Sequence, residues 1–278
     1  MRISSVLAIL SLALACSAAP SLDKRIIGGT DVQPDELPFI AEIRNRRSPC
    51  TAFVIAPRVI MTAAHCLGDR SHSGVIYGSN LKGEGHSADD VKFVPHPAYD
   101  SKKNLNDIGL IFVEQPMNTT VAKIGMKYPK AGSTIMAAGF GDTDNQGGDS
   151  PNLKKVALKV ATAAECKVNK PNFDSKTQFC TSDKPVGHSV CNGDSGGPLY
   201  TGSGKSLRVV GLVSHGTKAR ACGEEGNPQY FTFIKPYLKW VRSEIRKFES
   251  EQSAQQKSAA PEESIQVADD TDDDSSDA

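Results

Sequence analysis

Short apolar segments separated by turn residues occupy the chain between Phe39 and Gly216. Gly, Pro, Asn and Asp stand between these segments, a pattern typical of a protein made of many short strands. The clearest segments span residues 53–56, 75–77, 108–113, 135–138, 156–160 and 209–213. The pattern therefore predicts an all-β fold.

Helical periodicity becomes clear only towards the C-terminus. Apolar residues recur there at spacings of three and four, at Ile234, Tyr237, Leu238, Val241 and Ile245. This spacing predicts a helix over Lys235–Lys247 that packs on the β-structure. Residues 249–278 hold four Glu, six Asp and one Lys, a net charge of −9, with too few apolar side chains to fold alone. We expect this acidic segment to be a disordered tail.

The first residues of the chain predict export. An apolar run over 6–15, followed by small residues over 16–19, is typical of a cleaved secretory signal, which we assign to residues 1–18. The run is shorter than the about 20 residues that a membrane-spanning helix needs. A lipidated Cys16 is the alternative interpretation. We expect a secreted, extracellular protein with no membrane anchor.

The sequence CNGDSGGP over residues 191–198 combines a nucleophile with a backbone anion site. A serine hydroxyl needs a base and hydrogen-bond donors for the oxyanion that it creates. Gly193 has no Cβ, so its N–H and that of Ser195 can point at one oxyanion. His65 follows an apolar strand and is the candidate base, and Asp107 precedes another apolar run and is the candidate that orients the imidazole. The set predicts acyl-transfer chemistry.

These motifs together resemble the chymotrypsin-like (trypsin-fold) serine proteases. The resemblance rests on TAAHC around His65, NDIGLI around Asp107, GDSGGP around Ser195 and the IIGG sequence that begins at Ile26. It covers about residues 26–248. It implies two packed six-stranded antiparallel Greek-key barrels with a C-terminal helix, and a serine endopeptidase that works through an acyl-enzyme.

The resemblance also implies activation by cleavage. Lys24-Arg25 is a dibasic pair directly before Ile26, so residues 19–25 form a short propeptide. Cleavage after Arg25 frees the Ile26 ammonium, which in the family pairs with the aspartate before the nucleophile, here Asp194. Such a pair would shape the Gly193 and Ser195 loop, because a buried carboxylate needs a partner.

Six cysteines remain once the signal is removed, and an even number in an exported chain predicts a disulfide framework. Counting alone allows 15 pairings. The resemblance implies one of them, which joins Cys50 to Cys66, Cys166 to Cys180, and Cys191 to Cys222.

Ser214-His215-Gly216 follows an apolar strand and resembles the segment that binds substrate as an added β-strand. Ser214 is also expected beside Asp107 as a hydrogen-bond donor. Many relatives carry an aromatic residue where this chain has His215, which leaves the subsites beyond the primary pocket open. Gly216 is expected to leave the entrance of the primary pocket clear.

The base of the primary pocket carries Ser189, where trypsin-like members have an aspartate. A neutral base disfavours a buried Lys or Arg, because a buried charge without a partner is costly. Val190 and Pro228 are expected to narrow the walls. We therefore expect cleavage after Phe, Tyr, Leu or Met, with small aliphatic residues second. Glu224 and Glu225 keep a basic preference as an alternative.

Other motifs add little chemistry. The histidines lack metal-ligand spacing, so we expect no metal and no cofactor. Asn118 begins an N-glycosylation sequon. The expected partners are protein or peptide substrates and proteinaceous protease inhibitors, with no nucleic acid, and we expect a monomer. A catalytically silent binding or inhibitor protein on the same fold is the competing function, and an esterase without useful proteolysis is a third.

Overall fold

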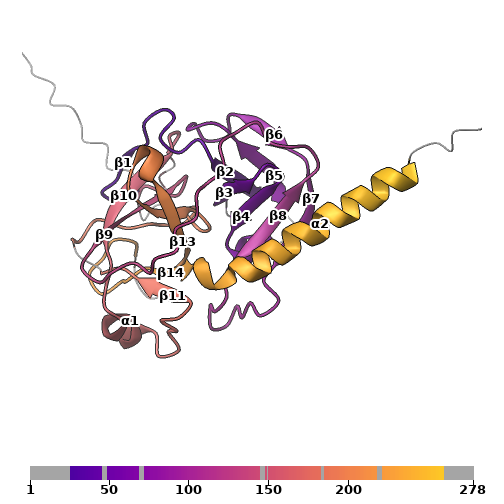
Figure 1. The fold of residues 1–278 in the computed structure, drawn as a ribbon. Helices are drawn as coiled ribbons and strands as arrows, with labels where there is room; N and C mark the ends of the chain where they lie inside the picture. Colours follow the sequence, from indigo (N-terminus) through magenta and orange to yellow (C-terminus); the bar gives the residue numbers. More distant parts are fainter. Residues whose placement is uncertain are drawn as a thin grey trace, which may run out of the picture.

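The computed structural model describes residues 26–45, 49–68, 72–144, 148, 150–182, 185–217 and 221–259. Two antiparallel sheets of seven strands lie side by side (Figure 1). The N-terminal sheet has the order β6 (His86–Ala88), β5 (His72–Tyr77), β2 (Ile40–Asn45), β3 (Cys50–Ala56), β4 (Val59–Thr62), β8 (Gly109–Val113) and β7 (Asp90–Pro95). The C-terminal sheet has the order β1 (Thr30–Asp31), β10 (Lys154–Lys159), β9 (Thr134–Gly139), β12 (Pro198–Thr201), β13 (Arg208–His215), β14 (Tyr230–Phe233) and β11 (Gln178–Cys180).

The prediction of an all-β fold with two packed barrels and a C-terminal helix is confirmed. Each sheet counts seven strands because the short strands β1 and β6 extend their edges. Both sheets curl back on themselves. In the N-terminal sheet, β6 and β7 are the two outer strands, and residue 89 alone connects them. In the C-terminal sheet, a bridge between Val160 and Thr181 links the ends of β10 and β11.

Strand burial follows from where each strand lies. Every residue of β8 is buried, because β8 pairs with β4 and β7 and is covered by the C-terminal helix. In β10 the buried positions alternate, since Val156 and Leu158 face the core and Ala157 and Lys159 face solvent. This period of two matches the pleat of a strand with one buried face.

The helices are few within the described residues. A short 3₁₀ turn, η1 (Ala64–Leu67), follows β4, and α1 (Ala163–Asn169) begins at Thr162, whose side chain forms a capping box with Glu165. The 3₁₀ turns η2 (Gly204–Ser206) and η3 (Lys235–Tyr237) precede β13 and the last helix, α2 (Leu238–Ala259). No helix in the described part of the chain is both long and apolar enough to cross a membrane.

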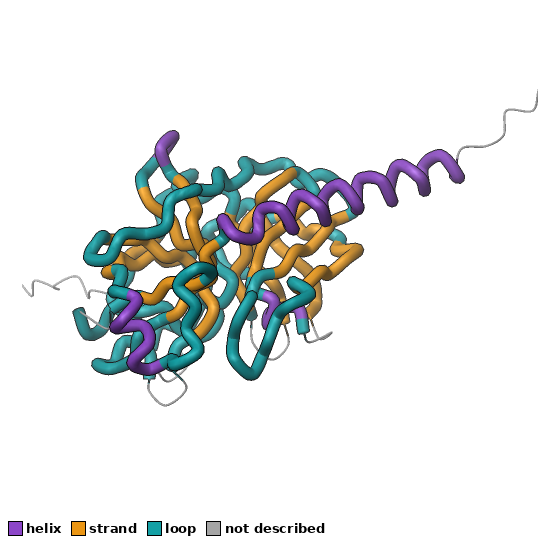
Figure 2. Tube along the Cα trace, turned by 60° about the horizontal axis from the view of Figure 1, so that its bottom comes forward, coloured by secondary structure: helices purple, strands orange, loops and turns teal. Residues whose placement is uncertain are grey.

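The expected end of the last helix near Lys247 is wrong, and so is the expectation that the tail is disordered from residue 249. Helix α2 continues to Ala259 and extends beyond the two sheets (Figures 1 and 2). Phe248 stacks on Phe112 with ring centroids 4.5 Å apart, and Glu251 pairs with Lys92 at 2.6 Å. These contacts nucleate a helix that good helix formers then propagate. Residues 260–278 lie outside the described residues.

Candidate active site

His65 lies on the 3₁₀ turn η1 directly after the buried strand β4. Its backbone N–H donates to Asp107 Oδ1 at 3.0 Å, and its Nδ1 lies 2.8 Å from Asp107 Oδ2. The Asp107 carboxylate therefore holds both the main chain and the ring of His65. The imidazole side chain is 33% exposed, which leaves its other nitrogen open to the cleft.

Asp107 is buried, with 1% of its surface exposed, between the two sheets. Ser214 Oγ donates to its Oδ2 at 2.6 Å, and Thr232 Oγ1 donates to its main-chain oxygen at 2.8 Å. Burial by itself raises the pKa of Asp107, but the hydrogen bonds from His65 and Ser214 and the attraction of His65 outweigh burial and lower it. The group is thus an ionised carboxylate with His65 on one side and the C-terminal barrel on the other.

Ser195 lies in a turn that is bonded to the opposite barrel. The Thr51 amide donates to Ser195 O at 2.9 Å, and the Thr51 hydroxyl donates to Gly193 O at 2.9 Å. Gly193 has a φ of 91°, and a Cβ there would lie 2.7 Å from Gly141 Cα, so only glycine fits. Within the described chain, the amides of Gly193 and Ser195 have no protein acceptor. Both N–H groups are therefore open to an oxyanion.

The serine loop and the histidine turn meet at a disulfide. Cys66, next to His65, is bonded to Cys50, and its Sγ lies 3.7 Å from Ser195 O. Among the described residues, the Ser195 hydroxyl and His65 form no hydrogen bond with each other, as is common before substrate closes such a site.

The three predicted disulfides are confirmed. They are Cys50–Cys66, Cys166–Cys180 and Cys191–Cys222. In the described residues the only group close enough to hold a metal ion is Cys50, His65 and Cys66. Both cysteines are oxidised in the disulfide and offer no thiolate, so this group does not suit a metal.

Asp194 is fully buried, and its carboxyl forms no ion pair with any described residue. Its carboxylate accepts the Gly141 amide at 2.9 Å and the Cys191 amide at 2.8 Å. Burial raises its pKa to about 7, although these two amides lower it. The predicted partner Ile26 is also fully buried and belongs to the core of the C-terminal barrel, and Ile27 O accepts the Ser189 amide at 3.0 Å. Arg25 lies outside the described residues.

A cavity of about 470 Å³ opens beside Ser195. Val190 and Val213 line its apolar part. Its polar part includes residues that sequence reasoning missed, among them Asn192, Thr217, Asn227 and Gln229. Ser214, His215 and Gly216 also line it, as predicted for the substrate strand. No Asp or Glu of the described chain lines this cavity, so its walls are neutral.

Two residues that we predicted for the primary pocket, Pro228 and Ser189, do not line this cavity. Pro228 faces a separate cavity near α1, because residues in an extended segment alternate sides and Asn227 and Gln229 take the inner side. Ser189 is buried, and its hydroxyl donates to Val190 O at 2.7 Å. Glu224 is exposed and its carboxylate accepts the Ala221 amide at 3.2 Å.

The side chain of His215 belongs to a polar chain that reaches Asp107. Lys170 Nζ lies 2.9 Å from His215 Nε2, and His215 Nδ1 lies 3.0 Å from Ser214 Oγ. Because Ser214 donates its only proton to Asp107, His215 Nδ1 donates to Ser214 and His215 Nε2 accepts from the lysine. His215 also stacks on Tyr230, with ring centroids 5.0 Å apart.

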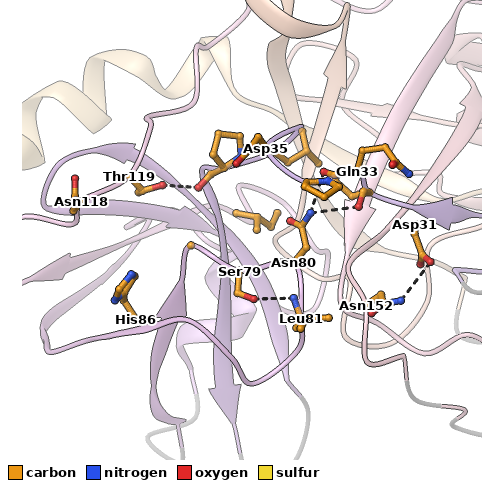
Figure 3. A pocket seen from close by; sticks show the side chains of 16 residues that line it. Asp31, Gln33, Asp35, Ser79, Asn80, Leu81, His86, Asn118, Thr119 and Asn152 are labelled. Atoms are coloured by element: carbon orange, nitrogen blue, oxygen red, sulfur yellow. Dashed lines mark hydrogen bonds between the residues drawn. The ribbon is translucent and has the colours of Figure 1, made fainter.

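Another cavity, of about 620 Å³, shares no lining residue with the cavity beside Ser195. Figure 3 shows the side chains that line it. Residues around β1, β2 and β5 line it, and Asn118 stands at its edge. Asn118 is exposed, and the next residue, Thr119, donates its hydroxyl to Pro38 O. The side chain of Asn118 is thus accessible, as a glycosylation site requires.

Two packed antiparallel barrels, with a histidine–aspartate pair on one side of a cleft and a glycine-framed serine on the other, define a serine protease. The trypsin family model matches residues 26–241, and the chain belongs to this family. It is 30% identical to granzyme-like protein 1 of Rattus norvegicus over 86% of this chain and 99% of that protein. It is 31% identical to granzyme F of Mus musculus over 80% and 92%, and 28% identical to serine protease 1 of Homo sapiens over 86% and 97%. The protein is a serine endopeptidase.

Proposed function

We propose that this endopeptidase uses Ser195 as nucleophile, His65 as general base and Asp107 as the group that orients His65. His65 takes the Ser195 proton as the hydroxyl attacks the substrate carbonyl, and the amides of Gly193 and Ser195 bind the oxyanion. His65 then returns the proton to the leaving amine, and water hydrolyses the acyl-enzyme. The two contacts between Asp107 and His65, at 3.0 and 2.8 Å, carry this proposal.

The neutral walls of the Ser195 cavity support cleavage after a large neutral residue such as Phe, Tyr, Leu or Met. A Lys or Arg side chain would lose its hydration there without gaining a carboxylate partner. The side-chain amide of Gln229 also favours a tyrosine hydroxyl over a purely apolar ring, because a buried hydroxyl needs a hydrogen-bond partner. The amide of Asn227 is already bonded to Thr217 and Ala221.

We propose that cleavage between Arg25 and Ile26 activates the enzyme. The uncleaved chain holds Ile26 at a φ of 38°, a left-handed conformation that is strained for a β-branched residue and costs about 1–3 kcal/mol. Cleavage removes the preceding carbonyl and the strain, and it creates an ammonium near the serine loop. The buried Asp194, whose pKa is raised to about 7, is the partner that such an ammonium would ionise.

The first 25 residues support a signal over 1–18 and a propeptide over 19–25, and hence secretion. Asn118 is exposed and is the proposed glycosylation site. Residues 260–278 keep an acidic composition that we propose as a solvated tail. The three chemical groups are all present, which argues against a catalytically silent homologue.

The test combines an active-site probe with a peptide library. The chain processed to begin at Ile26 is treated with a serine-directed fluorophosphonate, with Ser195→Ala as the control. We expect labelling of the processed chain alone and cleavage after large neutral residues. Labelling with cleavage after Arg or Lys would overturn only the proposed specificity. No labelling of a chain with a confirmed Ile26 terminus would overturn the proposed roles of the three residues.

A further inference from the structure

A second cavity, of about 420 Å³, adjoins the one that contains Ser195. The two share His215, Gly216 and Thr217 as a common wall. Two loops form the remaining sides of the second cavity, residues 102–104 and residues 169–172. We call this cavity the lysine pocket, because Lys102, Lys103 and Lys170 line it.

The two loops of the lysine pocket are bonded to each other. Asn172 donates its side-chain amide to Lys103 O at 3.1 Å, and Lys170 Nζ donates to Asn104 O at 3.1 Å. Gln178 donates to the same Asn104 oxygen at 2.8 Å. The pocket is therefore largely formed before any ligand enters, as is usual for binding sites.

Lys170 is 6% exposed, and its ammonium has no carboxylate within 4.0 Å in the described part of the chain. Its two hydrogen-bond partners, Asn104 O and His215 Nε2, are neutral. The ammonium also lies 5.3 Å from the centroid of the Tyr230 ring. A buried cation without an anion is costly, so a carboxylate at this point would stabilise it.

The charged side chains that line the lysine pocket are all cationic, and Asp107, which attracts Lys170, lies outside the lining. No described Asp or Glu lines the pocket. Asp100 lies behind one loop and pairs with Lys103 at 3.7 Å, but its carboxylate is also occupied by the amides of Lys102 and Lys103 at 3.0 and 3.1 Å. The Lys102 ammonium has no ion pair among the described residues. The pocket thus carries a net positive charge.

The shared wall places the lysine pocket on the path of a bound peptide. A peptide that adds to residues 214–216 as a strand advances about 3.3 Å per residue. A chain with its scissile bond at Ser195 therefore brings the side chains a few residues upstream of that bond to Gly216 and Thr217, where the lysine pocket opens.

From this placement, and resting on the proposed function, we infer that the lysine pocket binds an acidic side chain of the substrate. The residue is Asp or Glu and lies two to four positions before the scissile bond. Lys170 is the main partner of its carboxylate, with Lys102 and Lys103 at the entrance. The enzyme therefore recognises two features of its substrate, a large neutral residue at the cleaved bond and an Asp or Glu two to four residues before it.

Matched peptides test this inference. Three pairs carry the best residue from the library at the cleaved bond and either Glu or Gln at position two, three or four upstream. We expect kcat/KM for the Glu peptide to exceed that for the Gln peptide by about tenfold at one position, and the ratio to fall as salt screens the charges.

Two variants test whether the preference for Glu over Gln arises in the lysine pocket. Lys170→Met should bring the Glu-to-Gln ratio close to one, and the double variant Lys102→Gln, Lys103→Gln should lower it partly, because these lysines are exposed. Lys127→Met removes an exposed lysine elsewhere and should keep the ratio. The double variant alone decides the matter if Lys170→Met does not fold.

The outcomes separate this inference from the proposed function. An enzyme that is labelled and cleaves the peptides, but with a ratio near one at all three positions, overturns the lysine pocket alone. A ratio that Lys127→Met lowers as much as Lys170→Met also overturns it. An enzyme that neither takes the label nor cleaves any peptide overturns both.

Discussion

The two barrels each supply half of the active site, and the two halves differ in how fully their buried carboxyl groups are satisfied. On the side of the N-terminal barrel, the His65 and Asp107 pair is already assembled, and the carboxylate accepts hydrogen bonds from three donors, the His65 amide, His65 Nδ1 and Ser214 Oγ. On the side of the C-terminal barrel, the turn that carries Ser195 also carries Asp194, a fully buried carboxyl whose pKa is raised to about 7 and which has no ion pair in the described part of the chain.

This difference shows where regulation can act. A carboxylate that is satisfied by fixed neighbours does not respond to processing elsewhere in the chain. A buried carboxyl near its neutral form responds strongly, because one new ammonium changes its charge state. We therefore expect the N-terminal half of the site to set the rate of catalysis and the C-terminal half to set whether catalysis occurs.

Asp107→Asn should produce the largest effect. The amide cannot accept at every site where the carboxylate does, so His65 is held in the wrong tautomer, and we expect kcat to fall by roughly 10⁴. Steady-state kinetics on the processed enzyme measures this, with exposed Glu114→Gln as a control that retains activity. A tenfold loss or less would show that the His65 contacts do not need the charge.

Asp194 makes the uncleaved chain sensitive to pH. Its folded pKa of about 7 lies above the ordinary aspartate value of 3.8, so the folded state binds more protons between these two pH values. The contribution of Asp194 to stability is thus present below about pH 4 and is lost as pH rises to 7, by roughly 4 kcal/mol. Thermal unfolding of the uncleaved variant Arg25→Gln, which resists processing, should show this loss.

Adding Asp194→Asn to that variant should flatten its pH dependence in the same range, because no carboxyl remains to ionise. The processed chain should lose less stability between pH 4 and 7, since the Ile26 ammonium offsets the buried charge. Identical pH profiles for the processed and unprocessed chains would contradict the assignment of Asp194 as the element that responds to cleavage.

Sequence reasoning succeeded where one short motif determines the geometry. The two-barrel fold, the three disulfides and the contacts among His65, Asp107 and Ser214 match the expectations that came with the motifs. It failed where neighbours distant in sequence decide. The contact between Lys170 and His215 spans 45 positions and has no local signature, so only the fold shows that the histidine joins a buried lysine.

Two other predictions were wrong because they left out how a segment packs in the folded chain. Composition alone described residues 249–259 as a tail, whereas the anchoring of α2 through Phe248 and Glu251 extends the helix across them. Pro228 was assigned to the pocket by its place in the chain, but the alternation of an extended segment turns Asn227 and Gln229 inward instead. Neither the side of an extended segment that faces a pocket nor the tertiary contacts that anchor a helix can be predicted from composition or from position in the chain.

Lys170 offers a test of the lysine pocket by pH. Burial lowers the pKa of Lys170 to about 8, although Asp107 raises it. Its ammonium faces Asn104, His215 and Tyr230, with Lys102 and Lys103 at the entrance. The preference for Glu over Gln upstream should therefore fall from about tenfold towards one as pH rises well above 8 and Lys170 loses its charge. Both peptides of a pair meet the same catalytic groups, so effects of pH on catalysis itself cancel in the Glu-to-Gln ratio, and in Lys170→Met the ratio should not vary with pH.

The smallest expected effect concerns Gln229 in the primary cavity. A Cβ on Gly216 would lie 2.8 Å from Gln229 Oε1, so the amide stands at the pocket entrance. Gln229→Leu keeps the size but removes the amide, and should raise the preference for Phe over Tyr by about threefold, because the net contribution of a hydrogen bond is as small as about 0.6 kcal/mol at the low end of its range. The exposed Gln256→Leu on α2 is the control. An unchanged ratio would mean that the tyrosine hydroxyl does not bond to Gln229, so that the amide at the pocket entrance does not distinguish Tyr from Phe.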